Sequence, residues 1–496
     1  MAMQLQFSKK ILPYLRRAVW EVKNEEYTQE VKLPESLPDI GRILCVWGQP
    51  LIRSKEWRGS NMSVSGGIMV WILYAPEEGA QQCVETWIPF QTQWDFPQTQ
   101  YDAAMRISCH MKGIDARSVS ARKMMVRVVL NIAGEAMEPT QAEWYQCADV
   151  PEDVHILKNN YPLRLPIEAG EKTLTLDEEL TYNGGAGQIS QVLYCTLRPE
   201  LTDQKVMADK VVYRGIARAE MLCRCAEGTL ESCEYEIPFS QYGELEREYD
   251  GHATSDVLPV VTNLEVDVQD NGMLRLKAGL VGQYVIYDTA IVDVVTDAYS
   301  NRRAVTLQRD ELKLPAVLEI KQEVLPVESA DESLPDETLD MRMLLQHPSL
   351  SRIGDGWLME IPGSFQLLGR DDDDDLMSSH LRWENKRDII SDAKASVIVR
   401  SSQKGKLKKM GSNLAGEITV DMTITTETDI PMIESLELGE LQKPDENRPS
   451  LILRRVGKDS LWEIAKSCGS SVEDIRLCNG IASDPTEESI LLIPVS

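Results

Sequence analysis

Residues whose side chains could carry chemistry occur in this sequence, but they do not gather into the motifs of known reactions. The patterns G-x-x-x-x-G-K-[ST], H-E-x-x-H and G-x-S-x-G are absent, and carboxylates are too common in so acidic a chain to indicate a site. None of the five histidines stands in a pair with metal-ligand spacing: His110, His155, His252, His347 and His380. We therefore predict that the protein is not an enzyme and has no catalytic residue, metal or cofactor.

Two charged clusters could bind a ligand or a partner. Five consecutive aspartates repel one another, which predicts a solvated loop; calcium binding is the alternative, although spaced oxygen ligands with a turn glycine suit that ion better. Four lysines around a glycine indicate the tip of a hairpin, and the alternative is a docking site for an acidic partner. The clusters are Asp371 to Asp375 and Lys404, Lys406, Lys408 and Lys409, with Gly405 in the expected turn.

Composition bounds the class of protein. The chain has 496 residues, 43% hydrophobic residues and a formal net charge of -27, which suits a soluble protein of three or four domains and argues against binding nucleic acid or an anionic membrane. No apolar run approaches the ~20 residues of a spanning helix, and the N-terminal segment shows no signal peptide. The ten cysteines are scattered, and only Cys223 and Cys225 lie close together. We expect reduced thiols in a cytoplasmic protein.

The last 46 residues have the pattern of a small strand–helix–helix–strand module. An apolar strand at Leu451–Leu453 precedes a helix that Asp459 or Ser460 caps. A second helix is expected after Ser470, with Glu473 completing a capping box, and Asn479-Gly480 ends it. A strand over 490–493 closes the module, and Trp462 is predicted to belong to its core.

This segment resembles a LysM domain, a family that commonly binds N-acetylglucosamine chains in a shallow groove. Two departures lie near that groove: Lys458 stands where the family has Gly, and Glu487-Glu488-Ser489 replaces Pro-Gly-Gln. The resemblance places the binding loops at Lys458, Asp459, Ser460, Leu461, Asn479, Gly480 and Ile481. Glycan binding and a LysM fold kept for protein contact both remain open.

The body of the chain repeats with a spacing of 149 residues. Residues 40–90 align with 189–239 without a gap, and a weaker third copy carries Pro348 and Gly363. Alternating and β-branched runs predict a mainly β protein of tandem sandwich-like or barrel-like domains, followed by the small βααβ module. One long helix is expected over Lys9–Asn24. The predicted division is 1–24 helical segment, 25–150, 151–325 and 326–440 β-rich repeats, 441–449 linker, and 450–496 LysM-like domain.

Short segments of the body are similar to the SPOCS domain. They include residues 33–40, 114–117, 297–300 and 429–433, and SPOCS repeats with a C-terminal LysM are the layout of SipL-like spore-coat morphogenetic proteins. The resemblance implies a non-enzymatic scaffold in the mother-cell cytoplasm at the forespore surface. It also implies that the LysM domain contacts the coat-basement ATPase, a stage IV sporulation protein A-like partner. The alternative is a protein that binds peptidoglycan or other N-acetylglucosamine glycans.

Overall fold

The protein is built almost entirely of antiparallel β-strands. The computed structural model describes residues 3–58, 60–95, 103–146, 149–182, 187–269, 272–332, 334–335, 337–354, 356–371, 373–389, 394–442, 449–483, 485 and 489–495. Within these ranges the only helices are two short ones near the C-terminus, α1 (Leu461–Cys468) and α2 (Val472–Asn479). The predicted mainly β class is confirmed.

The first unit, residues 8–146, contains two facing sheets of three strands each. One sheet has the order β2-β7-β6 and the other β3-β4-β5. Their strands are β2 (Ser8–Lys32), β3 (Arg42–Arg58), β4 (Asn61–Ala75), β5 (Gln82–Asp95), β6 (Ala104–Ser120) and β7 (Lys123–Gln146). Alternate side chains of both sheets, such as Val64, Ile68, Val126 and Val128, point inward and are fully buried, so the sheets share one core.

The second and third units repeat this plan. Unit 2, residues 154–300, pairs a β11-β12-β8 sheet with a β10-β9 sheet, and unit 3, residues 305–438, pairs a sheet of β13, β19 and β18 with one of β14 to β17. The strands of unit 2 are β8 (Val154–Leu180), β9 (Ile189–Cys225), β10 (Leu230–Tyr249), β11 (Thr254–Val268) and β12 (Leu274–Ser300). Those of unit 3 are β13 (Val305–Ala330), β14 (Glu337–Leu345), β15 (Ser349–Ile353), β16 (Gly356–Arg370), β17 (Leu376–Ile389), β18 (Ser396–Met410) and β19 (Asn413–Leu438).

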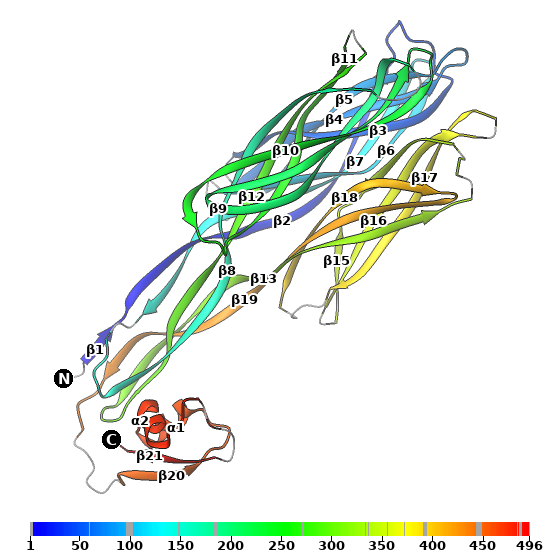
Figure 1. The fold of residues 1–496 in the computed structure, drawn as a ribbon. Helices are drawn as coiled ribbons and strands as arrows, with labels where there is room; N and C mark the ends of the chain where they lie inside the picture. The colour runs from blue at the N-terminus through cyan, green and yellow to red at the C-terminus, as the bar shows by residue number, and fades with distance from the viewer. Residues whose placement is uncertain are drawn as a thin grey trace.

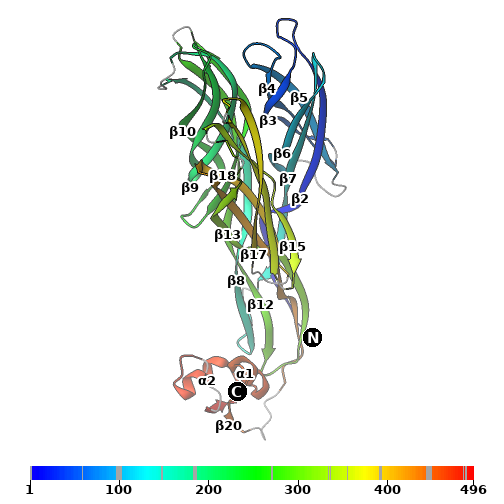
Figure 2. The ribbon, with the colours of Figure 1, turned by 90° about the vertical axis from the view of Figure 1, so that its right-hand side faces the viewer.

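The first and last strands of each unit pair with each other and extend well beyond the unit's other strands. These long antiparallel pairs, β2–β7, β8–β12 and β13–β19, run together into a narrow stalk, while the remaining strands form three heads at the other end (Figures 1 and 2). The core of the stalk takes side chains from all three units, including Trp144, Leu165 and Ile430. The short strand β1 (Met3–Gln6) adds to β19 near the tip.

The structure corrects the predicted helix and two boundaries. Residues Lys9–Asn24 belong to β2, which pairs with β7 from Ser8↔Gln146 to Lys32↔Lys123. The predicted boundary between residues 24 and 25 divides β2, and the predicted boundary after residue 325 divides β13. The error has a physical cause: these strands pair with partners roughly 80 to 140 residues away, and local spacing does not contain that information. Most of the predicted linker 441–449 lies outside the described residues.

The sequence repeat corresponds to the same contact in each unit. Gly66, Gly215 and Gly363 each face an aromatic residue on the neighbouring strand: Phe90, Phe239 and Trp383. A Cβ added at these glycines would lie 2.7, 2.5 and 2.2 Å from the respective ring. The ring therefore occupies the space that any side chain would need, which explains why a glycine and an aromatic residue recur together.

We expect Gly215→Ala to lower the free energy of unfolding by about 1–3 kcal/mol, because it overpacks a filled space. The new Cβ would lie 2.2 Å from the Glu200 carbonyl oxygen as well as against Phe239. Urea denaturation measures the change. Gly113→Ala is the matched control, since no atom lies within 4 Å of its added Cβ. Equal stability of the two variants would contradict the packing argument.

Candidate functional site

The C-terminal module is a complete βααβ fold at the end of the stalk. Strands β20 (Leu451–Arg455) and β21 (Ile490–Pro494) pair, and α1 and α2 cover one face of this small sheet (Figure 1). Ser460 caps α1, as expected, and it forms a full capping box with Glu463 that was not predicted from the sequence. The cap of α2 is Ser471, which accepts a hydrogen bond from the Asp474 amide, so the predicted Ser470–Glu473 box is wrong by one residue.

Most of the predicted loop residues are engaged in holding this module together. Asp459 pairs with Arg454 at 2.6 Å, and Leu461 is buried in the core. The Asn479 amide bridges α2 to β21: its nitrogen donates to the carbonyls of Ile475 and Leu492 at 2.8 and 2.6 Å, and its oxygen accepts from the Leu492 amide at 2.8 Å.

The remaining loop residues divide between structure and solvent. Gly480 ends α2 in the left-handed conformation, with φ of 64°, and Ile481 packs against the core. Lys458 is exposed. Glu487 and Glu488, the second departure from the LysM pattern, lie outside the described residues.

The module is docked on the stalk rather than held by its linker alone. Asp297 at the end of β12 accepts hydrogen bonds from Trp462 Nε1 at 2.8 Å and from Lys466 Nζ at 2.6 Å. Beside it, the Tyr299 hydroxyl donates to the Ser470 carbonyl at 2.8 Å. Burial alone would raise the pKa of Asp297, but the hydrogen bonds from Lys466 and Trp462 outweigh it and lower that pKa.

Aromatic packing completes this dock. The rings of Tyr299 and Trp462 meet edge to face with centroids 4.8 Å apart, and Tyr299 is only 6% exposed. Trp462, predicted as a core residue, is partly buried against the module and also reaches the stalk. Asp297 and Tyr299 belong to the SPOCS-like segment 297–300, and sequence reasoning did not connect this segment with the module.

The outer face of the module's sheet is apolar and exposed. Leu451, Leu453, Ile490 and Leu492 are 48%, 68%, 64% and 37% exposed. Leu453 stands directly opposite Leu492, and alternation along each strand puts all four side chains on the face away from the helices. We call these four residues the aliphatic face. Four neighbouring exposed aliphatic side chains on so small a module are typical of a protein contact surface.

Buried ion pairs join the three units where the heads meet the stalk. The guanidinium of Arg106 in unit 1 donates to Asp256 of unit 2 at 3.0 Å, and Arg400 of unit 3 contacts the same carboxylate. Glu135 lies 3.3 Å from Arg106 and 3.5 Å from Arg400 and also accepts from Arg17 at 2.8 Å. We call these five residues the three-unit ion cluster. Arg106 is 2% and Glu135 is 1% exposed.

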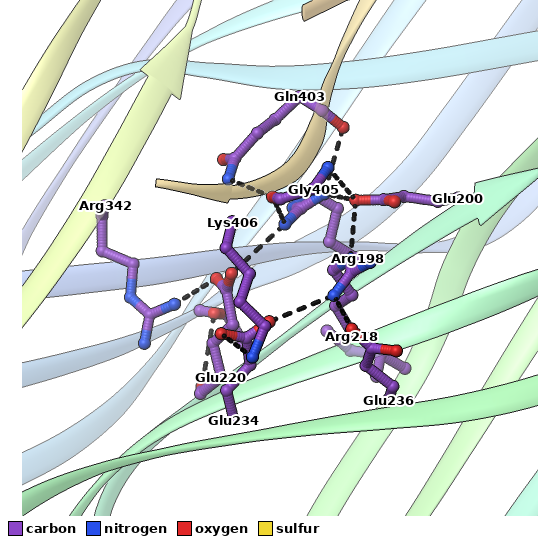
Figure 3. Close-up of polar contacts among 12 residues, drawn as sticks. Arg198, Glu200, Arg218, Glu220, Glu234, Glu236, Arg342, Gln403, Gly405 and Lys406 are labelled. Carbon is purple, nitrogen blue, oxygen red and sulfur yellow. Dashed lines mark hydrogen bonds and ion pairs between the residues drawn. The ribbon is translucent and has the colours of Figure 1, made fainter. Parts of the chain in front are cut away.

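A second network links units 2 and 3 (Figure 3). Glu200 contacts Arg198 and Arg218, and Glu220 contacts Arg198 and Arg342. Two backbone contacts bring unit 3 to this network: Gly405 N–H donates to Glu200 at 3.0 Å, and Arg198 donates to the Gly405 carbonyl at 3.0 Å.

Of the predictions for the two charged clusters, the lysine hairpin tip is wrong and the exposed aspartate turn is confirmed. The Lys404–Lys409 segment is not a hairpin tip: Gly405 lies inside β18 at a register shift, and the turn comes at Gly411. Contacts with Arg198 and Glu200, which are distant in sequence, set this geometry. The aspartate run does form the exposed turn between β16 and β17, where Asp371 accepts from the amides of Asp373 and Asp375; Asp372 lies outside the described residues.

His110 of unit 1 and His347 of unit 3 lie near each other, with their ring centroids 6.1 Å apart. His347 Nδ1 donates a hydrogen bond to the Pro348 carbonyl at 2.9 Å. Burial, together with the neighbouring His347, lowers the pKa of His110 to about 3. Within the described ranges no three His, Cys, Asp or Glu residues gather in a way that could hold a metal.

We expect the free energy of unfolding to fall as pH drops below about 6.5. In this range His110 becomes protonated in the unfolded chain but stays neutral in the folded protein, where it is buried. Between this value and the folded pKa of about 3, the unfolded state binds more protons and is favoured. Urea midpoints at pH 7.5 and 5.5 measure the loss. His110→Gln should reduce the pH dependence, whereas His252→Gln, at an exposed position, should not. An unchanged slope in His110→Gln would contradict the assignment.

The nine cysteines that the structure describes are free thiols, and Cys147 lies outside the described residues. Neither of the two helices in the described ranges is long and apolar enough to cross a membrane.

Comparison with known proteins identifies two parts of the chain. Residues 188–269, which contain β9, β10 and β11, match the SipL family model described as the SPOCS domain. Residues 458–485, which span both helices of the terminal module, match the LysM domain model. No curated protein and no solved structure matches the chain. The chain therefore carries a SipL-type SPOCS domain in unit 2 and a LysM domain at the end of its stalk.

Proposed function

We propose that this protein is a non-enzymatic scaffold of spore coat assembly that acts in the mother-cell cytoplasm at the forespore surface. The SPOCS match supports the place in coat assembly, because that domain is described for SipL. We extend it to three SPOCS-like units, since units 1 and 3 repeat the glycine–aromatic contact of the matched unit. Such a body presents its terminal domain at the end of the stalk.

The aliphatic face of the LysM domain is the observation that carries the proposal. Full burial of an exposed leucine contributes about 1.5–3 kcal/mol, so four such side chains supply a substantial part of a protein–protein affinity. We propose that this face contacts the coat-basement ATPase that the family resemblance implies. The adaptor then holds the coat base through the LysM domain and offers its three heads to other coat proteins.

Glycan binding is the second candidate, because LysM domains are associated with N-acetylglucosamine chains. The match to the LysM model favours it. Against it, Asp459, Leu461 and Asn479 are occupied in internal contacts of the domain. A groove that used these loops would have to recruit backbone groups and Lys458 instead.

The test compares the full chain with a Leu453→Asp/Leu492→Asp double variant. Binding to purified coat-basement ATPase is measured by biolayer interferometry, and co-sedimentation with purified peptidoglycan is measured in parallel. We expect the double variant to bind the ATPase at least about tenfold more weakly, because two charges would be buried at the contact. Both positions are exposed, so the LysM fold should persist, which circular dichroism checks.

Leu318→Asp is the matched control, since Leu318 is a leucine 54% exposed on β13, outside the LysM domain. This variant should bind the ATPase like the unaltered chain. Peptidoglycan retention without ATPase binding, unaffected by the double variant, would overturn the adaptor proposal and establish the glycan-binding alternative.

A further inference from the structure

The two strands of the LysM sheet bond to each other through alternate residues. The bonds at the two ends of the pair fix this alternation: the Val456 amide donates to the Ser489 carbonyl at 2.8 Å, and the Val495 amide to the Ser450 carbonyl at 3.1 Å. In an antiparallel pair, the residues between such bonds turn their amide and carbonyl groups away from the partner strand. These residues are Leu451, Leu453 and Arg455 in β20 and Ile490, Leu492 and Pro494 in β21.

The outer edge of β21 is occupied within the domain. The Leu492 amide donates to Asn479 Oδ1 at 2.8 Å, and the Leu492 carbonyl accepts from Asn479 Nδ2 at 2.6 Å. Pro494 has no amide hydrogen and therefore cannot donate to a further strand. This side of the sheet is closed to strand addition.

The outer edge of β20 is open. Among the residues that the structure describes, β20 pairs with β21 alone, and it lies on the side of the domain that faces away from the stalk (Figures 1 and 2). The amide and carbonyl groups of Leu451 and Leu453 point to this edge, and no described residue outside β21 bonds to them. Exposed edge strands readily pair with another strand, so proteins usually cover or blunt them. One closed edge and one open edge make β20 the side on which a strand can add.

The open edge and the aliphatic face form one continuous surface. Leu451 and Leu453 belong to both, because their backbone groups face the edge while their side chains, 48% and 68% exposed, lie on the aliphatic face. On an added strand, every second side chain would stand beside these leucines, where an aliphatic residue packs best. A helix laid on the aliphatic face would instead leave the backbone groups of the edge unpaired.

We propose that the coat-basement partner adds an extended segment, with aliphatic side chains at alternate positions, to the open edge of β20. The segment pairs with the five residues of β20 and extends the sheet to three strands, and the rest of the partner covers the aliphatic face. Main-chain hydrogen bonds then supply affinity, and the leucines select the alternating pattern. This inference rests on the proposed function and adds the way in which the partner is recognised.

Hydrogen–deuterium exchange with residue-level fragmentation tests strand addition directly. The full chain is measured alone and saturated with the purified coat-basement ATPase. We expect the Leu451 and Leu453 amides to exchange at least about tenfold more slowly in the complex, because each then donates to the added strand. The Ile452 and Arg454 amides, which already face β21, should change less. ATPase binding without protection of Leu451 and Leu453 would overturn the inference in favour of a contact through side chains alone.

Leu451→Pro and Leu451→Ala separate the backbone from the side chain. Both variants lose the leucine side chain, but only proline also removes the amide hydrogen and places its ring on the open edge. Proline is tolerated as the first residue of a strand, so the β20–β21 pair should persist, which circular dichroism checks. We expect Leu451→Pro to bind the ATPase roughly tenfold more weakly than Leu451→Ala. Equal affinities would contradict strand addition.

Failure of this inference and failure of the proposed function give different results. No binding of the unaltered chain to the ATPase would overturn both. Binding that Leu453→Asp/Leu492→Asp weakens, with equal affinities of the two Leu451 variants, would overturn strand addition alone. Protection of the Leu451 and Leu453 amides in the chain without ATPase, together with a dimer in light scattering, would also overturn it, because a second copy of the chain would then occupy the edge.

Discussion

Arg106→Ala should lower the free energy of unfolding by about 3–5 kcal/mol, the range for removing one partner of a buried ion pair. Arg106 stands between Asp256 and Glu135; Arg106 and Glu135 are buried and the Asp256 side chain is only 13% exposed, so water can compensate little for a lost partner. Removing the guanidinium leaves two carboxylates in this site with Arg400 and Arg17 as their remaining partners. Urea denaturation followed by tryptophan fluorescence measures the loss.

The matched control is Arg275→Ala. Arg275 also pairs with an aspartate, Asp177 at 2.8 Å, but both side chains are more than 40% exposed. Exposed pairs contribute only about 0–1 kcal/mol, so this variant should be close to the unaltered chain. Equal losses for Arg106→Ala and Arg275→Ala would show that the three-unit ion cluster does not hold the units together.

The same cluster predicts a change in acid resistance. Burial alone would raise the pKa of Asp256, but Arg106 and Arg400 lower it well below its usual range. A lowered folded-state pKa contributes stability above the unfolded value of about 4, and this contribution is lost as pH falls through the folded value. In Arg106→Ala part of that shift disappears, so its stability should fall at a higher pH than that of the unaltered chain.

The sequence allowed prediction of those parts of the fold whose contacts join residues close together in the chain. In the LysM domain, the Ser460 cap of α1 and the Gly480 end of α2 depend on residues no more than a few positions apart, and both were predicted. The repeat was visible because Gly66 and Gly215 face the same kind of ring 24 residues further along the chain. Each of these features is a contact within one hairpin or one helix end.

The stalk and the ion cluster could not be predicted because their partners are distant in sequence. Lys9 pairs with Tyr145, and Arg106 with Asp256, 150 residues away. A run such as Lys9–Asn24 is compatible with helix or strand until its partner strand is known. In the same way, nothing around Gly405 signals that Glu200 fixes its backbone. Charged residues at buried strand positions were the available signal, but without pairing they resemble ordinary surface charges.

The second large effect is expected from a substitution in the contact between the LysM domain and the stalk. Tyr299→Ala should release the domain from the stalk, because truncating a buried aromatic residue costs about 3–5 kcal/mol. The substitution removes the ring against Trp462 and the hydrogen bond to the Ser470 carbonyl. Only Asp297 would still hold α1, through Trp462 and Lys466 at a partly exposed site. The LysM core itself keeps Ile464, Ile475 and Ile493, so the domain should stay folded.

Backbone ¹⁵N relaxation of LysM amides distinguishes a docked domain from a free one. In the unaltered chain these amides should tumble with the whole body, and in Tyr299→Ala they should tumble as a small independent domain. Tyr299→Phe keeps the ring and loses one hydrogen bond, about 0.5–1.5 kcal/mol, so it should remain largely docked. Slow tumbling in Tyr299→Ala would contradict the dock. If this contact orients the aliphatic face, Tyr299→Ala should leave the intrinsic affinity for the proposed ATPase partner unchanged while abolishing the fixed direction in which the stalk presents the face.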